Sequence, residues 1–142
     1  AVDETTGEYE IRRIIACADV GKAINLNSCE GQMEGGCIQN VGMVTEGIKY
    51  KNGNMITKSL HEYLIPTAVD VPDVELIMLE SGGGIGPYGA KGIGEPSCNS
   101  IAPAVVSAIN DAVNTSLKRE QISPEVILHA IHGQYDELQI NY

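Results

Sequence analysis

Apolar residues along the chain follow two periods, one typical of strands and one typical of helices. Residues 8–18 are rich in β-branched and apolar side chains and predict a strand that becomes fully buried toward its end. The apolar run 74–79 predicts a second strand. Asn52 and Gly53 separate two short apolar runs, and because both positions tolerate positive φ the pair predicts a β-hairpin over 47–59.

Helical spacing of apolar residues runs from Ser28 to about Glu46. Capping residues indicate two further helices, one from Asn99 or Ser100 to about Asn114 and one from Ser123 to Gly133. Ser28 is the expected N-cap of the first segment. In the last segment a serine, a proline and a final glycine stand in the order typical of an N-cap, an N1 position and a C′ position. The segments predict three helices.

The first of these helices is unusually rich in glycine, with Gly31, Gly35, Gly36 and Gly42. Each glycine costs about 1 kcal/mol relative to alanine in a helix interior, so something must offset roughly 4 kcal/mol. Close approach of the helix backbone to a ligand or to another element is the usual compensation. Segment 81–96 contains so many glycines that it is expected to be a loop.

Together these elements predict an α+β fold in a single domain, with a mixed or antiparallel sheet, a β-hairpin and packed helices. No internal repeat or long linker divides the 142 residues, a length that suits one domain with one core. We expect the domain to span 1–133, and the polar stretch 134–142 to be a frayed tail or an arm toward another subunit.

Charge and hydropathy exclude two classes of partner. Nineteen acidic and nine basic residues give a net charge of −10, which repels a nucleic-acid backbone. No apolar run approaches the roughly 18 residues of a membrane span. The first ten residues are acidic, whereas a secretory signal is basic and then apolar. The composition therefore predicts a cytoplasmic protein that binds neither nucleic acid nor membrane.

Cysteine and histidine spacings do not indicate a protein-ligated metal. Cys17, Cys29, Cys37 and Cys98 lack C-x-x-C spacing, so the sequence predicts reduced core thiols and neither a zinc nor an iron–sulfur site. His61, His129 and His132 have no carboxylate or thiol patterned around them and are interpreted as surface residues.

Residues 84–89 match the G-x-G-x-x-G pattern of dinucleotide-binding proteins and follow a strand. That fingerprint requires a helix to begin inside the motif so that its N-terminus faces the pyrophosphate. Pro87 and the glycines that follow forbid such a helix, so we reject a dinucleotide site. Lys91 also lacks the G-K-[ST] context of a P-loop, which excludes a nucleotide triphosphate site.

Glu95 is the one acidic side chain of the glycine-rich loop and stands just before a predicted helix. One interpretation is a catalytic carboxylate on a loop that exposes backbone amides. The other is a charge that favours a helix N-terminus, an effect of about 0.3–1 kcal/mol. Spacing alone favours the second interpretation.

Five segments in order point to one known family. They are DVGKAIN at 19–25, GQMEGG at 31–36, YLIPTA at 63–68, GAKGIGEP at 89–96 and SPE at 123–125. They resemble segments of the large, molybdopterin-binding subunit of xanthine dehydrogenases, aldehyde oxidoreductases and related molybdenum hydroxylases. The resemblance covers Glu8 to Gly133 and indicates the C-terminal part of that subunit.

The resemblance implies roles for three residues. Glu95 aligns with the family's catalytic base, which takes a proton from a hydroxide on molybdenum. Gln32 aligns with the glutamine that contacts the pterin of the molybdopterin cofactor, and Ile93 aligns with a residue beside the metal and the substrate. The molybdenum would be held through the pterin, so no protein metal ligand is expected.

The resemblance also implies a larger assembly. The chain is shorter than the family's molybdenum-binding portion, so we expect further molybdenum-binding segments or subunits, an iron–sulfur subunit and a flavin subunit, with the iron–sulfur clusters and FAD on these partners. Two explanations fit this short length: the chain is a shortened form of the subunit, or the molybdenum-binding portion is naturally split among several subunits. Asn40 to Gly42 and the residues after Pro96 depart from the common family pattern, which leaves the substrate open among purines, N-heterocycles and aldehydes. A non-catalytic structural or assembly module that keeps the fold is the alternative.

Overall fold

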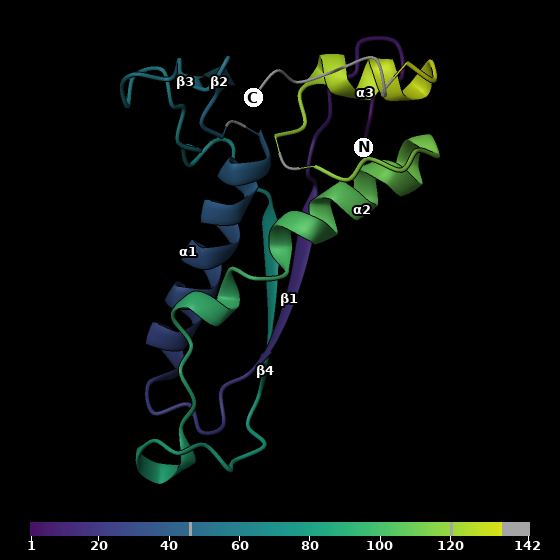
Figure 1. Ribbon diagram of the computed structural model, residues 1–142. Coiled ribbons are helices and arrows are strands. Elements are labelled where there is room, and N and C mark those ends of the chain that lie inside the picture. Colours follow the sequence, from purple (N-terminus) through teal and green to yellow (C-terminus); the bar gives the residue numbers. More distant parts are fainter. Residues whose placement is uncertain (46, 120, 135–142) are drawn as a thin grey trace.

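Two parallel strands, β1 (Arg13–Asp19) and β4 (Asp73–Leu79), form the central sheet (Figure 1). The computed structural model describes residues 1–45, 47–119 and 121–134. Arg13 pairs with Asp73 and Asp19 pairs with Leu79, so both strands end at the same level. Both predicted strands are confirmed, although β1 begins five residues later than the predicted start at residue 8.

Only one face of this sheet is buried by the described residues. Ile14 and Ala16 of β1 lie in the core, whereas Ile15 is 56% exposed and Cys17 is also exposed. On β4 the exposed fraction is 41% for Ile77. The prediction of a strand that becomes fully buried was therefore wrong, because α1 covers one side of the sheet and β1 keeps the alternating pattern of a half-buried strand.

Helix α1 (Leu26–Thr45) runs along the sheet and begins two residues before the predicted Ser28. The side chain Oδ1 of Asn25 accepts the backbone N–H of Ser28 at 3.0 Å, so Asn25 is the N-cap residue and Ser28 lies inside the first turn. The predicted cap was wrong because both residue types can cap, and the sequence favoured the one nearer to the first apolar periodic residue.

The predicted hairpin is confirmed as a short antiparallel pair, β2 (Tyr50–Lys51) and β3 (Asn54–Met55). Asn52 and Gly53 at its turn have φ values of 52° and 75°. The hairpin is a sheet of its own and does not join β1 and β4. The α+β single-domain prediction is confirmed, with the parallel and antiparallel pairs in two small sheets instead of one.

Two further helices follow the glycine-rich loop, α2 (Ile101–Val113) and α3 (Pro124–Ile131). Ser123 caps α3 by accepting the N–H of Val126 at 3.4 Å. The loop 81–96 holds only two short 3₁₀ turns, η1 (Pro87–Gly89) and η2 (Glu95–Ser97). No α-helix begins within 84–89, as the rejection of a dinucleotide site requires. Of the predicted tail, residues 135–142 lie outside the described residues.

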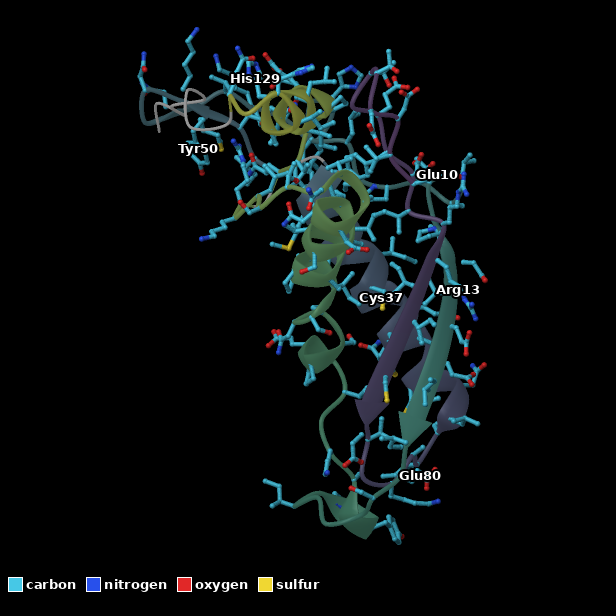
Figure 2. The ribbon with its side chains drawn as sticks, turned by 90° about the vertical axis from the view of Figure 1, so that its right-hand side faces the viewer. Glu10, Arg13, Cys37, Tyr50, Glu80 and His129 are labelled. Atoms are coloured by element: carbon cyan, nitrogen blue, oxygen red, sulfur yellow. The ribbon has the colours of Figure 1, made fainter. Side chains whose placement is uncertain are left out.

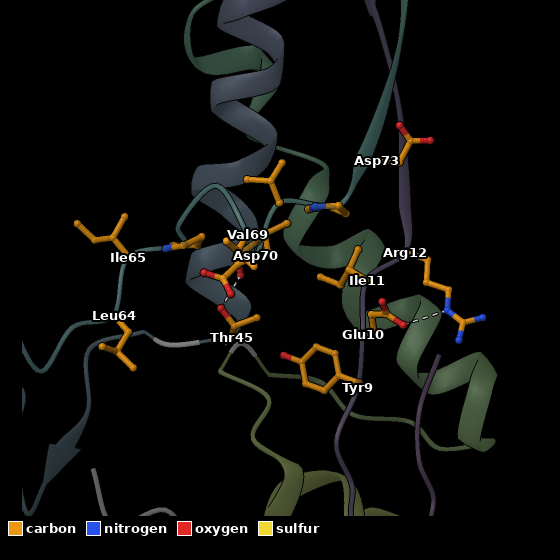
Figure 3. Close-up of a pocket in the computed structure, with 14 residues that line it drawn as sticks. Tyr9, Glu10, Ile11, Arg12, Thr45, Leu64, Ile65, Val69, Asp70 and Asp73 are labelled. Carbon is orange, nitrogen blue, oxygen red and sulfur yellow. Dashed lines mark hydrogen bonds and ion pairs between the residues drawn. The ribbon is translucent and has the colours of Figure 1, made fainter.

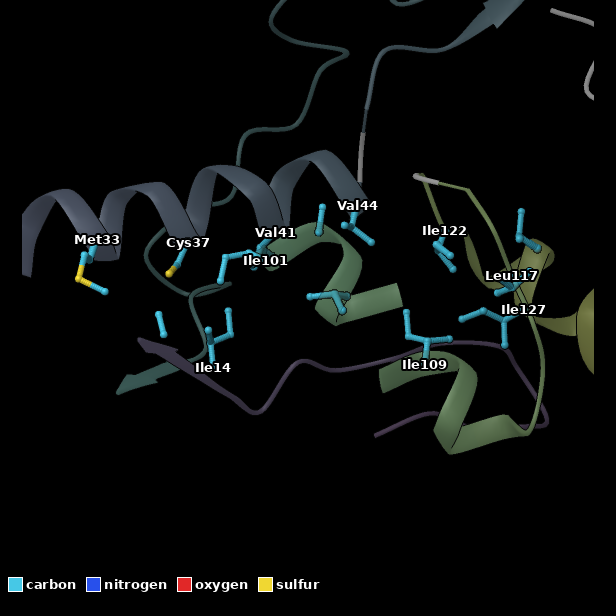
Figure 4. Packing of buried hydrophobic residues seen from close by; sticks show 14 residues of the cluster. Ile14, Met33, Cys37, Val41, Val44, Ile101, Ile109, Leu117, Ile122 and Ile127 are labelled. Atoms are coloured by element: carbon cyan, nitrogen blue, oxygen red, sulfur yellow. The ribbon is translucent and has the colours of Figure 1, made fainter. Parts of the chain in front are cut away.

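An aliphatic core joins α1, α2, β1 and the segment that leads into α3 (Figure 4). Because the chain has no Phe or Trp, the residues below 2% exposure include Met33, Ile122 and Ile127. Cys37 is fully buried there. The other three free cysteines are exposed or only partly buried, so the prediction of four core thiols holds for Cys37 alone. Among the described helices none is long and apolar enough to cross a membrane.

Candidate functional site

The carboxyl ends of β1 and β4, the start of α1 and the glycine-rich loop all lie at one end of the molecule (Figure 1). Open α/β sheets commonly bind ligands outside the carboxyl ends of parallel strands. All three residues implied by the resemblance, Gln32, Ile93 and Glu95, belong to α1 or to this loop and its following turn.

Asp19, the last residue of β1, is the most heavily hydrogen-bonded side chain at this end. Its Oδ2 accepts a hydrogen bond from the Nζ of Lys91 at 2.6 Å and another from the hydroxyl of Ser81. Its Oδ1 accepts the backbone N–H groups of Gly21 at 3.0 Å and Ser81 at 3.2 Å. Lys91, then the Ser81 hydroxyl and the Gly21 amide, hold the pKa of Asp19 well below its usual range. We call Asp19, Ser81 and Lys91 the Asp19 cluster.

Gly21 allows the turn after β1 to lie against the loop. Its φ is 68°, and a β-carbon at this position would lie 2.3 Å from the carbonyl oxygen of Gly89. The backbone N–H of Lys91 donates to the carbonyl of Val20 at 2.9 Å. A side chain at Gly21 would therefore separate the loop from the end of β1.

Gln32 and Glu95 are brought together although they are far apart in sequence. Ser97 is buried and its hydroxyl donates to the carbonyl of Gly94 at 2.7 Å and lies 3.3 Å from the carbonyl of Gln32. A β-carbon on Gly94 would lie 4.0 Å from Oε1 of Gln32. The segment that carries Glu95 thus packs directly on the turn of α1 that carries Gln32.

The three side chains differ in their surroundings. Gln32 and Glu95 are exposed, and within the described residues neither side chain has a hydrogen-bond partner. The described residues of this chain therefore do not enclose the Glu95 carboxylate. Ile93 is half-buried and packs against the hydrophobic core. The arrangement thus leaves one carboxylate and one amide exposed near each other on the surface of the described residues.

The four glycines of α1 fall into two pairs. A β-carbon on Gly36 would lie 2.1 Å from the Ser97 hydroxyl, and one on Gly42 would lie 2.8 Å from Pro66, so these two permit contacts within the chain. Added β-carbons on Gly31 and Gly35 would meet no atom within 4 Å. The second pair flanks Gln32 and leaves bare backbone facing open space, which suits close approach by a bulky group.

Two cavities of the described structure lie away from these residues. One of about 700 Å³ is lined by residues 9–12 and by the segment 64–73 (Figure 3). A second of about 470 Å³ lies between residues 9–15 and α2. Neither is lined by Gln32, Ile93 or Glu95, so these cavities do not serve as a pocket around the candidate base.

In the part of the chain that the structure describes, no group of three or more His, Cys, Asp or Glu side chains could hold an ion. His61 and His132 are exposed, in agreement with the sequence interpretation, whereas His129 is partly buried.

Comparison with known proteins gives a consistent result. Residues 1–72 match the family model of the molybdopterin cofactor-binding domain. The probable hypoxanthine oxidase of Escherichia coli K12 is 34% identical over 134 residues, which are 92% of this chain and 14% of that protein. The nicotine 6-hydroxylase large subunit of Paenarthrobacter nicotinovorans is 33% identical over 140 residues, 95% of this chain and 17% of that subunit.

A solved structure agrees in fold. Quinoline 2-oxidoreductase from Pseudomonas putida 86 superposes with a TM-score of 0.85 and 36% identity, over 92% of this chain and 17% of the other chain. The chain thus spans less than a fifth of each of these relatives. Because the family model covers half of its residues and the fold agrees over nearly all of them, the chain belongs to the molybdopterin cofactor-binding domain family of the xanthine dehydrogenase and aldehyde oxidoreductase type.

Proposed function

We propose that the chain supplies the catalytic base and part of the cofactor-binding surface of a molybdenum hydroxylase. The observation that carries this proposal is the packing of the Glu95 segment on α1 beside Gln32 and the bare backbone of Gly31 and Gly35. The relatives described above are named as a probable hypoxanthine oxidase, a nicotine 6-hydroxylase and a quinoline 2-oxidoreductase. We propose a substrate of the same chemical kind, a purine or another N-heterocycle, with an aldehyde as the other class.

The residues present suit a pterin cofactor. A flat ring system needs close approach to the backbone. The side of α1 that carries Gly31 and Gly35, here called the glycine face, permits such an approach. The Gln32 amide can donate and accept hydrogen bonds, as ring nitrogens and carbonyl groups require. When bound, the cofactor supplies the two-electron redox chemistry. Gln32 would orient the pterin, and Ile93, which packs on the core, would hold the loop backbone beside the substrate.

Glu95 is proposed to accept a proton at its carboxylate as an oxygen derived from water is transferred to carbon. Hydroxylation of a carbon by water releases two electrons and two protons, so a base near the reacting carbon removes one of the protons. The electrons would pass to iron–sulfur clusters and FAD on partner subunits or domains. The remaining molybdenum-binding segments would complete the pocket, because this chain spans only 14% to 17% of its relatives.

Isotope labelling tests this function. The native protein that contains the chain should oxidise hypoxanthine, quinoline or an aldehyde in ¹⁸O-labelled water and incorporate the label into the product. Parallel reactions with ¹⁸O₂ in ordinary water should give unlabelled product. Label derived from O₂ would contradict the proposal, and a native protein that oxidises none of the three substrate classes would favour the non-catalytic module.

A further inference from the structure

We infer that Asp19 is a positioning residue: through Ser81 and Lys91 it fixes both ends of the excursion 82–90 within the glycine-rich loop and thereby places Glu95, which follows this excursion. The inference rests on the proposed function, in which Glu95 is the base. It goes beyond that function because it assigns a catalytic consequence to a residue that touches neither cofactor nor substrate.

Asp19 holds the entry and the exit of the excursion 82–90, Ser81 and Lys91, at the same point. Ser81 at the entry gives its hydroxyl and its N–H to the carboxylate, and Lys91 at the exit gives its ammonium to the same Oδ2. Gly82 N–H donates to the Gly21 carbonyl at 3.0 Å. The intervening excursion is bonded to itself, since the N–H of Gly84 donates to the Gly89 carbonyl at 3.1 Å. Residues 82–90 therefore form an ordered excursion whose two ends, Ser81 and Lys91, are fixed by Asp19.

Glu95 lies between fixed points on both sides. On one side are Lys91, held by Asp19 and by the Val20 carbonyl, and Ile93, which packs on the hydrophobic core. On the other side is Ser97, which bonds to the Gly94 carbonyl and packs on α1. Gly92 and Gly94 are two of the three residues between Lys91 and Glu95, and glycine restricts the backbone least. The position of Glu95 consequently depends on these fixed points more than on its own backbone.

The Asp19 cluster fixes the position of the glycine-rich loop and contributes little to the free energy of unfolding of the domain. The side chains of Lys91 and Asp19 are 37% and 32% exposed, and partly exposed ion pairs stabilise folded proteins only weakly. Four donors nevertheless converge on one carboxylate, which stays ionised because Lys91 lowers its pKa. Loss of the carboxylate should therefore loosen the loop without unfolding the domain.

The chain offers a matched control at the same end of the sheet. Lys22 donates to Glu80 at 2.5 Å and joins the turn after β1 to the end of β4, where Figure 2 labels Glu80. This ion pair is also partly exposed, but neither residue bonds to Lys91 or to the exit of the loop. A Lys22→Met change removes an ion pair of the same kind and leaves the Asp19 cluster intact.

The test compares Asp19→Asn, Lys91→Met, Lys91→Arg and Lys22→Met in the native assembly. Hydrogen exchange is followed by mass spectrometry over 81–96, and kcat, KM and molybdenum content are measured. We expect Asp19→Asn and Lys91→Met to speed exchange of this segment and to lower kcat roughly tenfold or more, with KM and molybdenum content nearly unchanged. Lys91→Arg should recover most of the loss because it keeps the cation. Lys22→Met should resemble the parent.

Two results would overturn the inference. In one, residues 81–96 exchange at the parent's rate in both Asp19→Asn and Lys91→Met. In the other, exchange is faster but kcat stays within about twofold of the parent. Failure of the proposed function is separate, because it shows as undiminished turnover in Glu95→Gln, a change that should leave exchange of the loop unaltered.

Discussion

Replacement of Glu95 by glutamine should lower kcat of the assembled enzyme by roughly 10²–10⁴-fold or more, while folding and molybdenum content stay close to those of the parent. Glutamine keeps the size and the hydrogen-bonding capacity of the side chain but cannot accept the proton. Because the Glu95 side chain is exposed in this chain and forms no hydrogen bond to a described residue, its replacement should leave the packing of η2 on α1 intact.

Glu10→Gln is the control for this change, because it makes the same substitution at another exposed glutamate, one whose carboxylate pairs with Arg12 at 3.1 Å. Glu10 is exposed and lies just before β1, far from Glu80 at the opposite end of the sheet (Figure 2). Glu10→Gln should therefore leave turnover unchanged. The interpretation of Glu95 as a charge beside a helix N-terminus predicts only a small change in stability, about 0.3–1 kcal/mol, and no direct effect on turnover. A Glu95→Gln enzyme that contains molybdenum and turns over within about tenfold of the parent would show that Glu95 is not the base.

Adjacent glycines of α1 should respond to alanine in opposite directions. Gly36→Ala places a methyl group 2.1 Å from the buried Ser97 hydroxyl, and overpacking of this kind lowers the free energy of unfolding by about 1–3 kcal/mol. Gly35→Ala meets no atom and should raise the free energy of unfolding by up to about 1 kcal/mol, the helix propensity of alanine over glycine. Denaturant unfolding of the purified chain measures both changes.

The glycine pair also tests the proposed cofactor surface. In the assembled enzyme, Gly35→Ala adds a methyl group to the face of α1 on which the cofactor is proposed to lie, so molybdenum content should fall even though the helix itself is stabilised. The packing account fails if Gly36→Ala is as stable as the parent. The cofactor account of Gly35 fails if Gly35→Ala retains full molybdenum content.

Local signals in the sequence were sufficient for several elements. Asn52 and Gly53 fix the hairpin turn by their positive φ, and Ser123 with the following proline starts α3 as predicted. Exposure was less predictable because it depends on which elements cover a surface. Ile15 and Cys17 carry the hydrophobicity of a buried strand, but among the described residues no element covers their face of the sheet.

The candidate site was predictable only in part. The glycine excess of α1 indicated close approach, but which glycines face the chain and which face outward became clear from the contacts of Gly36 and Gly35. Ser97 and Gln32 are 65 positions apart, and Lys91 and Asp19 are 72 apart. No local period links such residues, so spacing could not predict the Asp19 cluster. The segments that contain Asp19 and Lys91 were recognised only as parts of family motifs.

Molybdenum and pterin analysis of the native protein tests the central claim most directly, because it does not depend on the choice of substrate. We predict stoichiometric molybdenum and pterin in the native assembly that contains this chain. We predict none on the chain purified alone, which offers Gln32 and the glycine face but spans less than a fifth of its relatives. A native assembly without molybdenum would contradict the proposed function, and stoichiometric molybdenum on the isolated chain would contradict the claim that it holds only part of the site.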